Sequence, residues 1–116
     1  MTSNTPFRLY KTNTHQGGQQ VPLIVHWQKG LPSDDQLRHQ YQHVTDLLPT
    51  ICELVGIEIP TSKGEEQLPP AAGNSFASSL TNPSADSTHS EQYYEMIGHR
   101  GMYKDGWSAS TIRQPE

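Results

Sequence analysis

The run VPLIVHW, Val21 to Trp27, constrains the fold of this chain more than any other segment. It is β-branched and apolar and ends in an aromatic residue, a pattern typical of a strand buried on both faces of a sheet. Pro22 is expected near the first position of the strand, because deeper in a sheet it would remove a hydrogen-bond donor. His26, inside the run, is expected to be a hydrogen-bonded core histidine.

The rest of the sequence is poor in residues that build a core. Leu, Ile, Val and Phe number 21 of 116 residues, which is below the roughly 20% that a chain needs to bury enough apolar surface. The net charge of -4 is too small to indicate charge-driven disorder. We therefore expect a partly loose chain, or a piece of a larger protein whose other part completes the core.

Charge and cysteine content exclude several classes of function. The chain is mildly acidic and has no run of Lys or Arg, so it lacks the electrostatic footprint of a protein that binds nucleic acid or an anionic membrane. Cys52 is the single cysteine, which excludes an internal disulfide and a thiolate metal cluster. No apolar run reaches the roughly 18 residues of a membrane helix, and no export signal is visible. We expect a soluble chain whose compartment, cytoplasmic or periplasmic, is undetermined.

A helix is predicted in the middle of the chain, where apolar residues recur every three or four positions. Pro49 is tolerated only in the first turn of a helix, so the helix is expected to begin with Thr45 or Asp46 as its cap. Gly56 is expected to end it. Residues 38–44, before the helix, are predicted to be extended, as a short strand.

The second half of the chain changes in composition twice. Residues 61–90 are dense in Ser, Pro, Gly and Ala, which predicts a long loop or linker with one short helical turn near Phe76 to Leu80. Beyond them, aromatic and apolar residues flank Asp105-Gly106, a two-residue hairpin signal. Three strands are predicted around these signals, namely Gln92 to Met96, Arg100 to Tyr103 and Trp107 to Thr111.

No complete catalytic or metal-binding motif is visible in the sequence. There is no G-x-S-x-G elbow, and Cys52 is expected to pack on the helix as a small apolar side chain. His39 and His43 stand four apart and would share one face of a helix, where a metal is chelated readily, but the extended backbone expected there separates them. Both are expected to be solvent-exposed polar residues, and so are two other histidines, His89 and His99.

Lys11 lies in a polar loop ahead of the Gly17-Gly18 pair and the apolar run. Glycine permits positive φ or close approach of the backbone to another group, and a lysine in such a loop is able to point its ammonium group into a cleft beside the end of the strand. That charge suits a tetrahedral oxyanion such as sulfate or phosphate. An ordinary solvated lysine fits the same residues. A nucleotide-binding loop does not, because the Gly pair follows the Lys and leads into a strand.

Three separated segments resemble the sulfatase family, and arylsulfatases in particular. YKTNTHQGGQQVPLIVHW is similar to the family's segment in which a Lys is followed five residues later by Glu or Gln, then by Gly-Gly and a proline-containing strand. HVTDLLPTICELVG is similar to its D-x-x-P-T-x-x-x-x-x-G helix. YYEMIGHRGMYKDGW is similar to its E-x-x-G-x-R segment with a D-G-W turn. Two positions depart from the common pattern, Gln16 where many members have Glu and Ser108 where many have Lys.

The resemblance implies the C-terminal part of an alkaline-phosphatase-like α/β fold. It makes residues 1–60 the end of the catalytic α/β domain, 61–90 a loop excursion, and 91–116 a small antiparallel C-terminal sheet. It also makes Val21 to Trp27 a strand of the main sheet and Asp46 to Gly56 a helix that covers this sheet.

The resemblance further implies a substrate-binding role for two residues. Lys11 would bind the sulfate group of a sulfate ester and stabilise the charge that develops as the sulfur–oxygen bond breaks, and His15 would line the same cleft. The parent enzyme would use calcium or magnesium and a formylglycine made from Cys or Ser in a C/S-x-P-x-R motif. This sequence has no such motif, since Cys52 is followed by Glu-Leu-Val. We therefore expect a piece of an arylsulfatase that has no catalytic residue or metal ligand of its own and is inactive alone.

Two alternatives stay open. One is a non-catalytic remnant or interaction module that associates with a partner through exposed sheet edges. The other is a piece of a phosphatase or phosphonate hydrolase of the same fold, which the D-G-W and Y-E-M-I-G-H-R features favour less.

Overall fold

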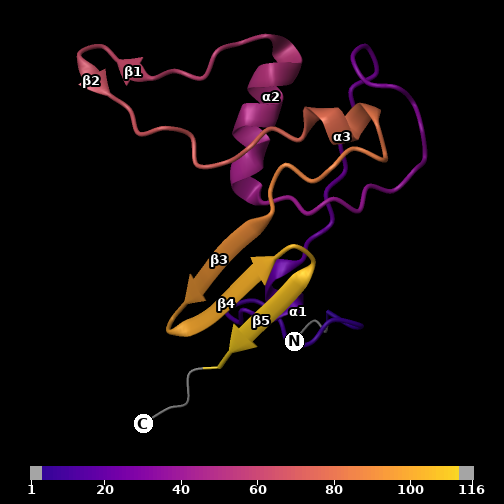
Figure 1. The fold of residues 1–116 in the computed structure, drawn as a ribbon, viewed down its shortest axis with the longest axis vertical. Helices are drawn as coiled ribbons and strands as arrows, with labels where there is room; N and C mark the ends of the chain where they lie inside the picture. The colour runs from indigo at the N-terminus through magenta and orange to yellow at the C-terminus, as the bar shows by residue number, and fades with distance from the viewer. Residues whose placement is uncertain (1–3, 113–116) are drawn as a thin grey trace. The chain divides into compact units, whose positions relative to one another are not determined.

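The chain combines a few short helices with two small antiparallel sheets (Figure 1). A computed structural model describes residues 4–112. They divide into two compact units. The sheet unit joins the N-terminal segment up to Val25 to the C-terminal segment from Ser90, and the helical unit is His26–His89. Within the described part of the chain, no helix is both long and apolar enough to span a bilayer.

The sheet unit contains three antiparallel strands in the order β3-β4-β5. Their bounds agree with the sequence prediction to within one residue: β3 is Glu91–Met96, β4 is His99–Lys104 and β5 is Trp107–Thr111. Asp105 and Gly106 connect β4 to β5 with φ angles of 45° and 88°. Positive φ at both positions is the tight-turn geometry that matches the twist of a hairpin, so the Asp-Gly signal is confirmed.

The N-terminal segment packs on one face of this sheet and is anchored there by Thr14, which is buried. The hydroxyl of Thr14 donates to the carbonyl oxygen of Arg100 at 2.9 Å, and the hydroxyl of Ser110 donates to the carbonyl oxygen of Thr14. Gly101 lies opposite Ser110 and beneath Thr14, where a Cβ atom would approach the Thr14 Cβ to 3.0 Å. Glycine at this position therefore lets the segment lie directly against β4.

The Gly17-Gly18 pair lies in α1 (Gln16–Gln19), a single turn that appears behind the sheet in Figure 1. A Cβ at Gly17 would lie 2.1 Å from the carbonyl oxygen of Leu9, and one at Gly18 would lie 2.0 Å from that of Asn13. The Gly17 N–H donates to the Arg8 carbonyl oxygen at 3.0 Å. Close backbone approach, one of the two expected reasons, thus explains both glycines, and it holds Arg8 beside the start of α1.

The predicted buried strand at Val21–Trp27 is wrong for the chain as described. All seven residues are exposed, Ile24 to 90%, and none is in a strand. His26 is exposed as well, so its expected place in a core is also wrong. The described residues offer this segment no neighbouring strand, and an extended run forms a sheet only when its N–H and C=O groups meet a partner. For the same reason, residues 38–44 do not form the predicted short strand.

The helical unit is built around α2 (Leu47–Val55), which follows a 3-10 turn, η1 (Val44–Asp46). Pro49 lies in the first turn of α2, and Asp46 is its N-cap residue. Gly56 ends the helix in the left-handed conformation with φ 70°, and its N–H donates to the Glu53 carbonyl oxygen. The predicted helix and both of its end signals are confirmed.

The remainder of the helical unit is mostly loop with little core. The predicted short turn is present as α3 (Ala77–Thr81), which contacts α2. A polar hairpin of β1 (Ser62–Lys63) and β2 (Glu66–Gln67) was not predicted, because it carries no apolar alternation. Apart from Pro49 in α2, the buried apolar side chains of the described part of the chain are Phe76 and Ala77. This agrees with the thin core that the composition predicted.

Replacement of Gly17 by alanine should destabilise the sheet unit more than replacement of Gly106. Gly17→Ala forces a methyl group into backbone oxygens and should cost about 3 kcal/mol. A Cβ at Gly106 meets no atom within 4 Å, so Gly106→Ala should cost only the strain of positive φ, about 1 kcal/mol. Urea unfolding followed by near-ultraviolet circular dichroism of the sheet tyrosines measures both. Equal losses would contradict close packing at Gly17.

Candidate functional site

Lys11 lies at the corner of a tight turn in the sheet unit. The Asn13 N–H donates to the Tyr10 carbonyl oxygen at 3.2 Å, and the Asn13 side-chain amide donates to the same oxygen. Thr12 has a φ of 75°, which is uncommon for a residue with a side chain. Lys11 is exposed, and within residues 4–112 no carboxylate forms an ion pair with it. Its ammonium group is therefore accessible to an anion from solvent.

His15 lies four residues further on, between the Thr14 anchor and α1. It is half-buried, and its Nδ1 atom is buried without a hydrogen-bond partner in the described structure. Together with neighbours from the N-terminal segment and from β5, it lines an open hollow of about 230 Å³. We call this the Arg8 hollow, and its lining residues are Arg8, His15, Gln16, Ser108 and Ser110.

The lining of the Arg8 hollow contains cationic and hydroxyl groups and no carboxylate. The Ser110 hydroxyl already donates its proton to the Thr14 carbonyl oxygen, so it has only acceptor capacity left. Arg8 and Ser108 have donors to offer, and a guanidinium group fits the two oxygens of a carboxylate, sulfate or phosphate. This set of groups favours an anion.

Lys11 and His15, the two residues that the sulfatase resemblance assigns to the substrate, lie in the same loop, but only His15 lines the Arg8 hollow. Arg8 was not singled out from the sequence, and Ser108 was noted only as a departure from the family pattern. Nothing in their spacing could have identified them, because they are 100 residues apart and meet only where the N-terminal segment packs on β5. The binding roles of Lys11 and His15 stay predictions.

A second polar cluster in the helical unit was also missed. His89 is 6% exposed, and its Nδ1 lies 2.8 and 2.9 Å from the two carboxylate oxygens of Asp46, which is 1% exposed. The prediction that His89 is a surface residue is therefore wrong. Forty-three residues separate the partners, and no local pattern links them.

Backbone groups complete the surroundings of the Asp46 carboxylate. The N–H groups of His43 and Asn74 donate to it at 2.7 and 2.9 Å. Gly73 makes the second contact possible, since a Cβ there would lie 2.2 Å from the Thr45 carbonyl oxygen. Burial alone raises the pKa of Asp46, but these two hydrogen bonds and the contact with His89 outweigh it and hold the pKa below its ordinary value of 3.8.

The Asp46–His89 pair is built for stability rather than for catalysis. Both side chains are buried, and the hydroxyl nearest to Asp46, that of Thr50, donates to its carbonyl oxygen at 2.6 Å instead of facing a substrate. The His43 ring lies 5.8 Å from that of His89. Burial and the charge of His89 lower the pKa of His43, against the opposing effect of Asp46.

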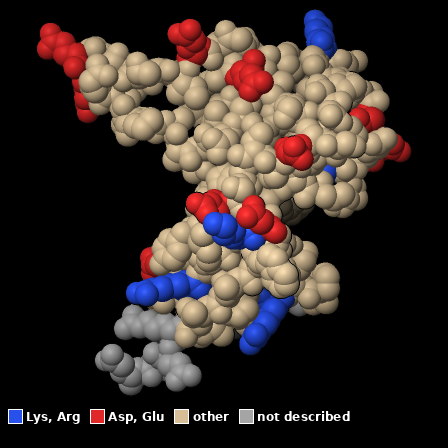
Figure 2. Space-filling model, in the orientation of Figure 1, with Lys and Arg blue, Asp and Glu red and all other residues tan. Residues whose placement is uncertain are grey.

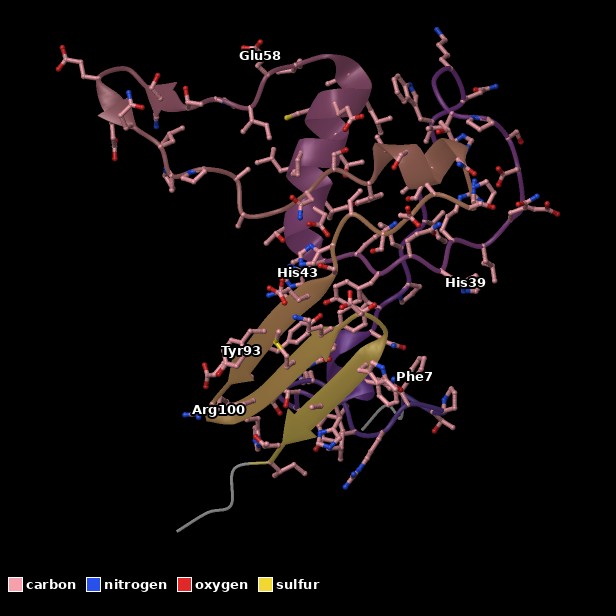
Figure 3. The ribbon with its side chains drawn as sticks, viewed as in Figure 1. Phe7, His39, His43, Glu58, Tyr93 and Arg100 are labelled. Carbon is pink, nitrogen blue, oxygen red and sulfur yellow. The ribbon has the colours of Figure 1, made fainter. Side chains whose placement is uncertain are left out.

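The residues described offer no metal centre. Among residues 4–112, no group of three or more His, Cys, Asp or Glu side chains is arranged to hold a metal ion. His39 and His43 lie well apart in Figure 3, although both belong to the helical unit. Cys52 is a free, half-exposed thiol on α2, outside any C/S-x-P-x-R motif. The described residues therefore do not form a binding site for calcium or magnesium, and Cys52 does not lie in a motif for formylglycine formation.

Charge on the surface is mixed. On the face that Figure 2 shows, the basic and acidic side chains of the coloured residues are scattered, with no large patch of one sign. One exposed pair on the sheet joins the Lys104 ammonium to the Glu91 carboxylate at 3.2 Å. This face therefore offers no basic patch for a polyanion.

Comparisons with known proteins point to one family. A family model described as Sulfatase matches residues 1–57. A curated protein described as "Sulfatase" from Formosa agariphila is 34% identical over 83 residues, which are 72% of this chain and 14% of the relative. The chain thus spans about a seventh of the length of that relative. Lys11, His15 and Arg8 lie within the matched range, whereas β3, β4 and β5 lie outside it.

Asp46→Asn should remove acid sensitivity from the helical unit. Because the pKa of Asp46 is lowered by folding, its contribution to stability is fully present above about pH 4 and is lost as the pH falls through the lower folded value. The variant should be less stable near neutrality, and its stability should depend less on pH below 4. Urea unfolding of α2 at several pH values, followed by circular dichroism at 222 nm, measures this. Asp86→Asn, at an exposed position, is the matched control; an equal effect there would contradict the role of Asp46.

Proposed function

We propose that the chain is part of a sulfatase that hydrolyses sulfate esters, because a family model described as Sulfatase matches residues 1–57. The observation that supports the proposal most directly is Lys11, which lies inside the matched range and has an accessible ammonium group without an ion-pair partner among the described residues. The domain boundaries at residues 60 and 90 belong to the same proposal.

In the proposed role, Lys11 binds the sulfate group of the substrate. As the sulfur–oxygen bond of the ester breaks, negative charge grows on the oxygens, and a fixed cation stabilises the transition state more than the ground state. The tight turn at Tyr10–Asn13 limits the freedom of the Lys11 backbone, which favours such positioning. His15, four residues away, lies at the edge of the same loop and contacts the remainder of the substrate.

We assign the chain to the arylsulfatase type because all three segments noted in the sequence are similar to that type. The parent enzyme would supply its nucleophile, a formylglycine, and its calcium or magnesium ion from residues that this chain does not contain. Its partner is a small sulfate ester rather than a nucleic acid or a membrane.

A second candidate, an interaction module without catalysis, is favoured by the exposed apolar segment Val21–Val25 and by the free edges of β3 and β5. The coding DNA upstream of Met1 separates the two candidates. An in-frame C/S-x-P-x-R motif supports the sulfatase part, and an immediate in-frame stop codon supports the interaction module.

The purified 116-residue chain should not turn over p-nitrophenyl sulfate, with or without added calcium or magnesium, because it contains no C/S-x-P-x-R motif. Release of p-nitrophenolate followed by absorbance measures this. Metal-dependent turnover by the chain alone would contradict the assignment.

Lys11→Gln in the longest in-frame protein that contains the chain should reduce kcat/KM for an aryl sulfate roughly 100- to 1,000-fold, the usual loss when one stabilising donor is removed from an anionic transition state. Lys29→Gln is the matched control, because Lys29 is also exposed and lies in a turn. Similar losses in both variants would show a general effect of charge and would exclude the role of Lys11.

A further inference from the structure

We propose that the Arg8 hollow binds a second anionic group of the substrate, a carboxylate or a further sulfate on the part of the molecule that does not react. The substrate class is then a sulfate ester with an additional negative charge. This inference rests on the proposed function for the identity of the ligand, but the anion site itself follows from the residues that line the hollow.

The backbone around the hollow is fixed by contacts that do not involve the proposed ligand groups. The carbonyl oxygen of Arg8 accepts from the Gly17 N–H at 3.0 Å, and Thr14 ties the next part of the loop to β4 and β5. Arg8 and His15 are therefore brought over β5 by main-chain and Thr14 contacts. Their side chains remain available for binding.

Arg8 differs from the other arginines of the described structure. Arg38 is occupied by Asp34 at 2.9 Å and by two carbonyl oxygens of α3. Arg100 lies on the opposite face of the sheet from Thr14, since its neighbour Gly101 is the residue under Thr14, and Figure 3 shows it near the end of the sheet where β3 connects to β4. Arg8 lines a hollow and has no ion pair within residues 4–112.

His15 and Ser108 add polar groups to the lining beside the Arg8 guanidinium group. The Nδ1 of His15 is buried and lacks a hydrogen-bond partner, whereas the great majority of buried polar atoms have one. This buried Nδ1 is an unmatched polar atom beside the hollow. Ser108, from β5, offers a hydroxyl to the hollow, and Ser110 is committed to Thr14. Arg8 and Ser108 thus both have donors for an anion in the hollow.

The size of the hollow limits what it holds. Its volume of about 230 Å³ is less than the roughly 300–1,000 Å³ of pockets that enclose a whole drug-sized ligand. One carboxylate or sulfate group with part of a ring fits this space, and the rest of the substrate extends outward. The hollow is therefore a subsite for one substituent and not a complete binding pocket.

The test is an NMR titration of the ¹⁵N-labelled 116-residue chain with sodium sulfate and, separately, with sodium glucuronate, at constant ionic strength kept by sodium chloride. The amides of His15 and Ser108 should shift with both probes. Arg8→Gln should raise Kd about tenfold, because a charge-assisted contact is lost. Arg100→Gln makes the same charge change on the other face of the sheet and should leave Kd within about twofold of the original.

Each outcome decides the proposal. Equal weakening by Arg8→Gln and Arg100→Gln, or shifts confined to residues outside the hollow, would overturn it. Weakening by Lys11→Gln but not by Arg8→Gln would overturn it while supporting the sulfate role of Lys11. If binding depends on Arg8 but the parent protein has no sulfatase activity, the anion site would be supported and the proposed function would be contradicted. A response to glucuronate alone would identify the group as a carboxylate, and a response to sulfate alone as a further sulfate. An unchanged amide spectrum outside the hollow in Arg8→Gln confirms that the variant is folded.

Discussion

The hydrogen bonds of Thr14 with β4 and β5 are the contacts on which the candidate site depends. Among the described residues, these hydrogen bonds involve side chains and attach the N-terminal loop to the C-terminal strands. Their partners are 86 to 97 residues apart in sequence. The contact is possible because Gly101 removes a side chain from beneath Thr14. His15, the next residue, is thereby held over β5, so the geometry of the hollow is a consequence of one buried threonine and one glycine.

The helical unit has a small apolar core and is held together largely by buried polar contacts. With Phe76, Ala77 and Pro49 as the buried apolar side chains of the described chain, apolar burial alone contributes little. The Asp46 carboxylate instead links segments that are far apart in sequence through His89 and Asn74, and it also accepts from the nearby His43 N–H. A buried charge is tolerable only if it is paired and hydrogen-bonded, and both oxygens of Asp46 meet this condition. If one of these hydrogen-bond donors were lost, the charge of the buried Asp46 carboxylate would be stabilised by too few hydrogen bonds.

The sequence predicted those elements whose signals are local. Pro49 and Gly56 fix the ends of α2 through backbone sterics, and Asp105-Gly106 fixes a hairpin because positive φ is needed at both positions. The prediction of a buried strand at Val21–Trp27 was wrong, because burial of a strand depends on neighbouring strands, and no local sequence pattern indicates whether these are present. The burial of His89 and the presence of the Arg8 hollow could not be predicted for the same reason. Asp46 lies 43 residues from His89, and Ser108 lies about 100 residues from Arg8. The resemblance assigns a role to Lys11, which stays a prediction, and it says nothing of Arg8, because a motif contains residues that are close in sequence and not those that are close only in space.

Lys11 and Arg8 are both cationic residues of the sheet unit, but their surroundings differ. Lys11 is exposed, and an exposed charge pair in water contributes at most about 1 kcal/mol, so its proposed catalytic effect requires a surrounding that excludes water. No described part of this chain covers it. Arg8 shares a hollow with a half-buried histidine and a serine, where the donors are already arranged around one space. Under the proposals above, Arg8 would recognise an anionic substituent within this chain, whereas the proposed effect of Lys11 would require residues outside the chain.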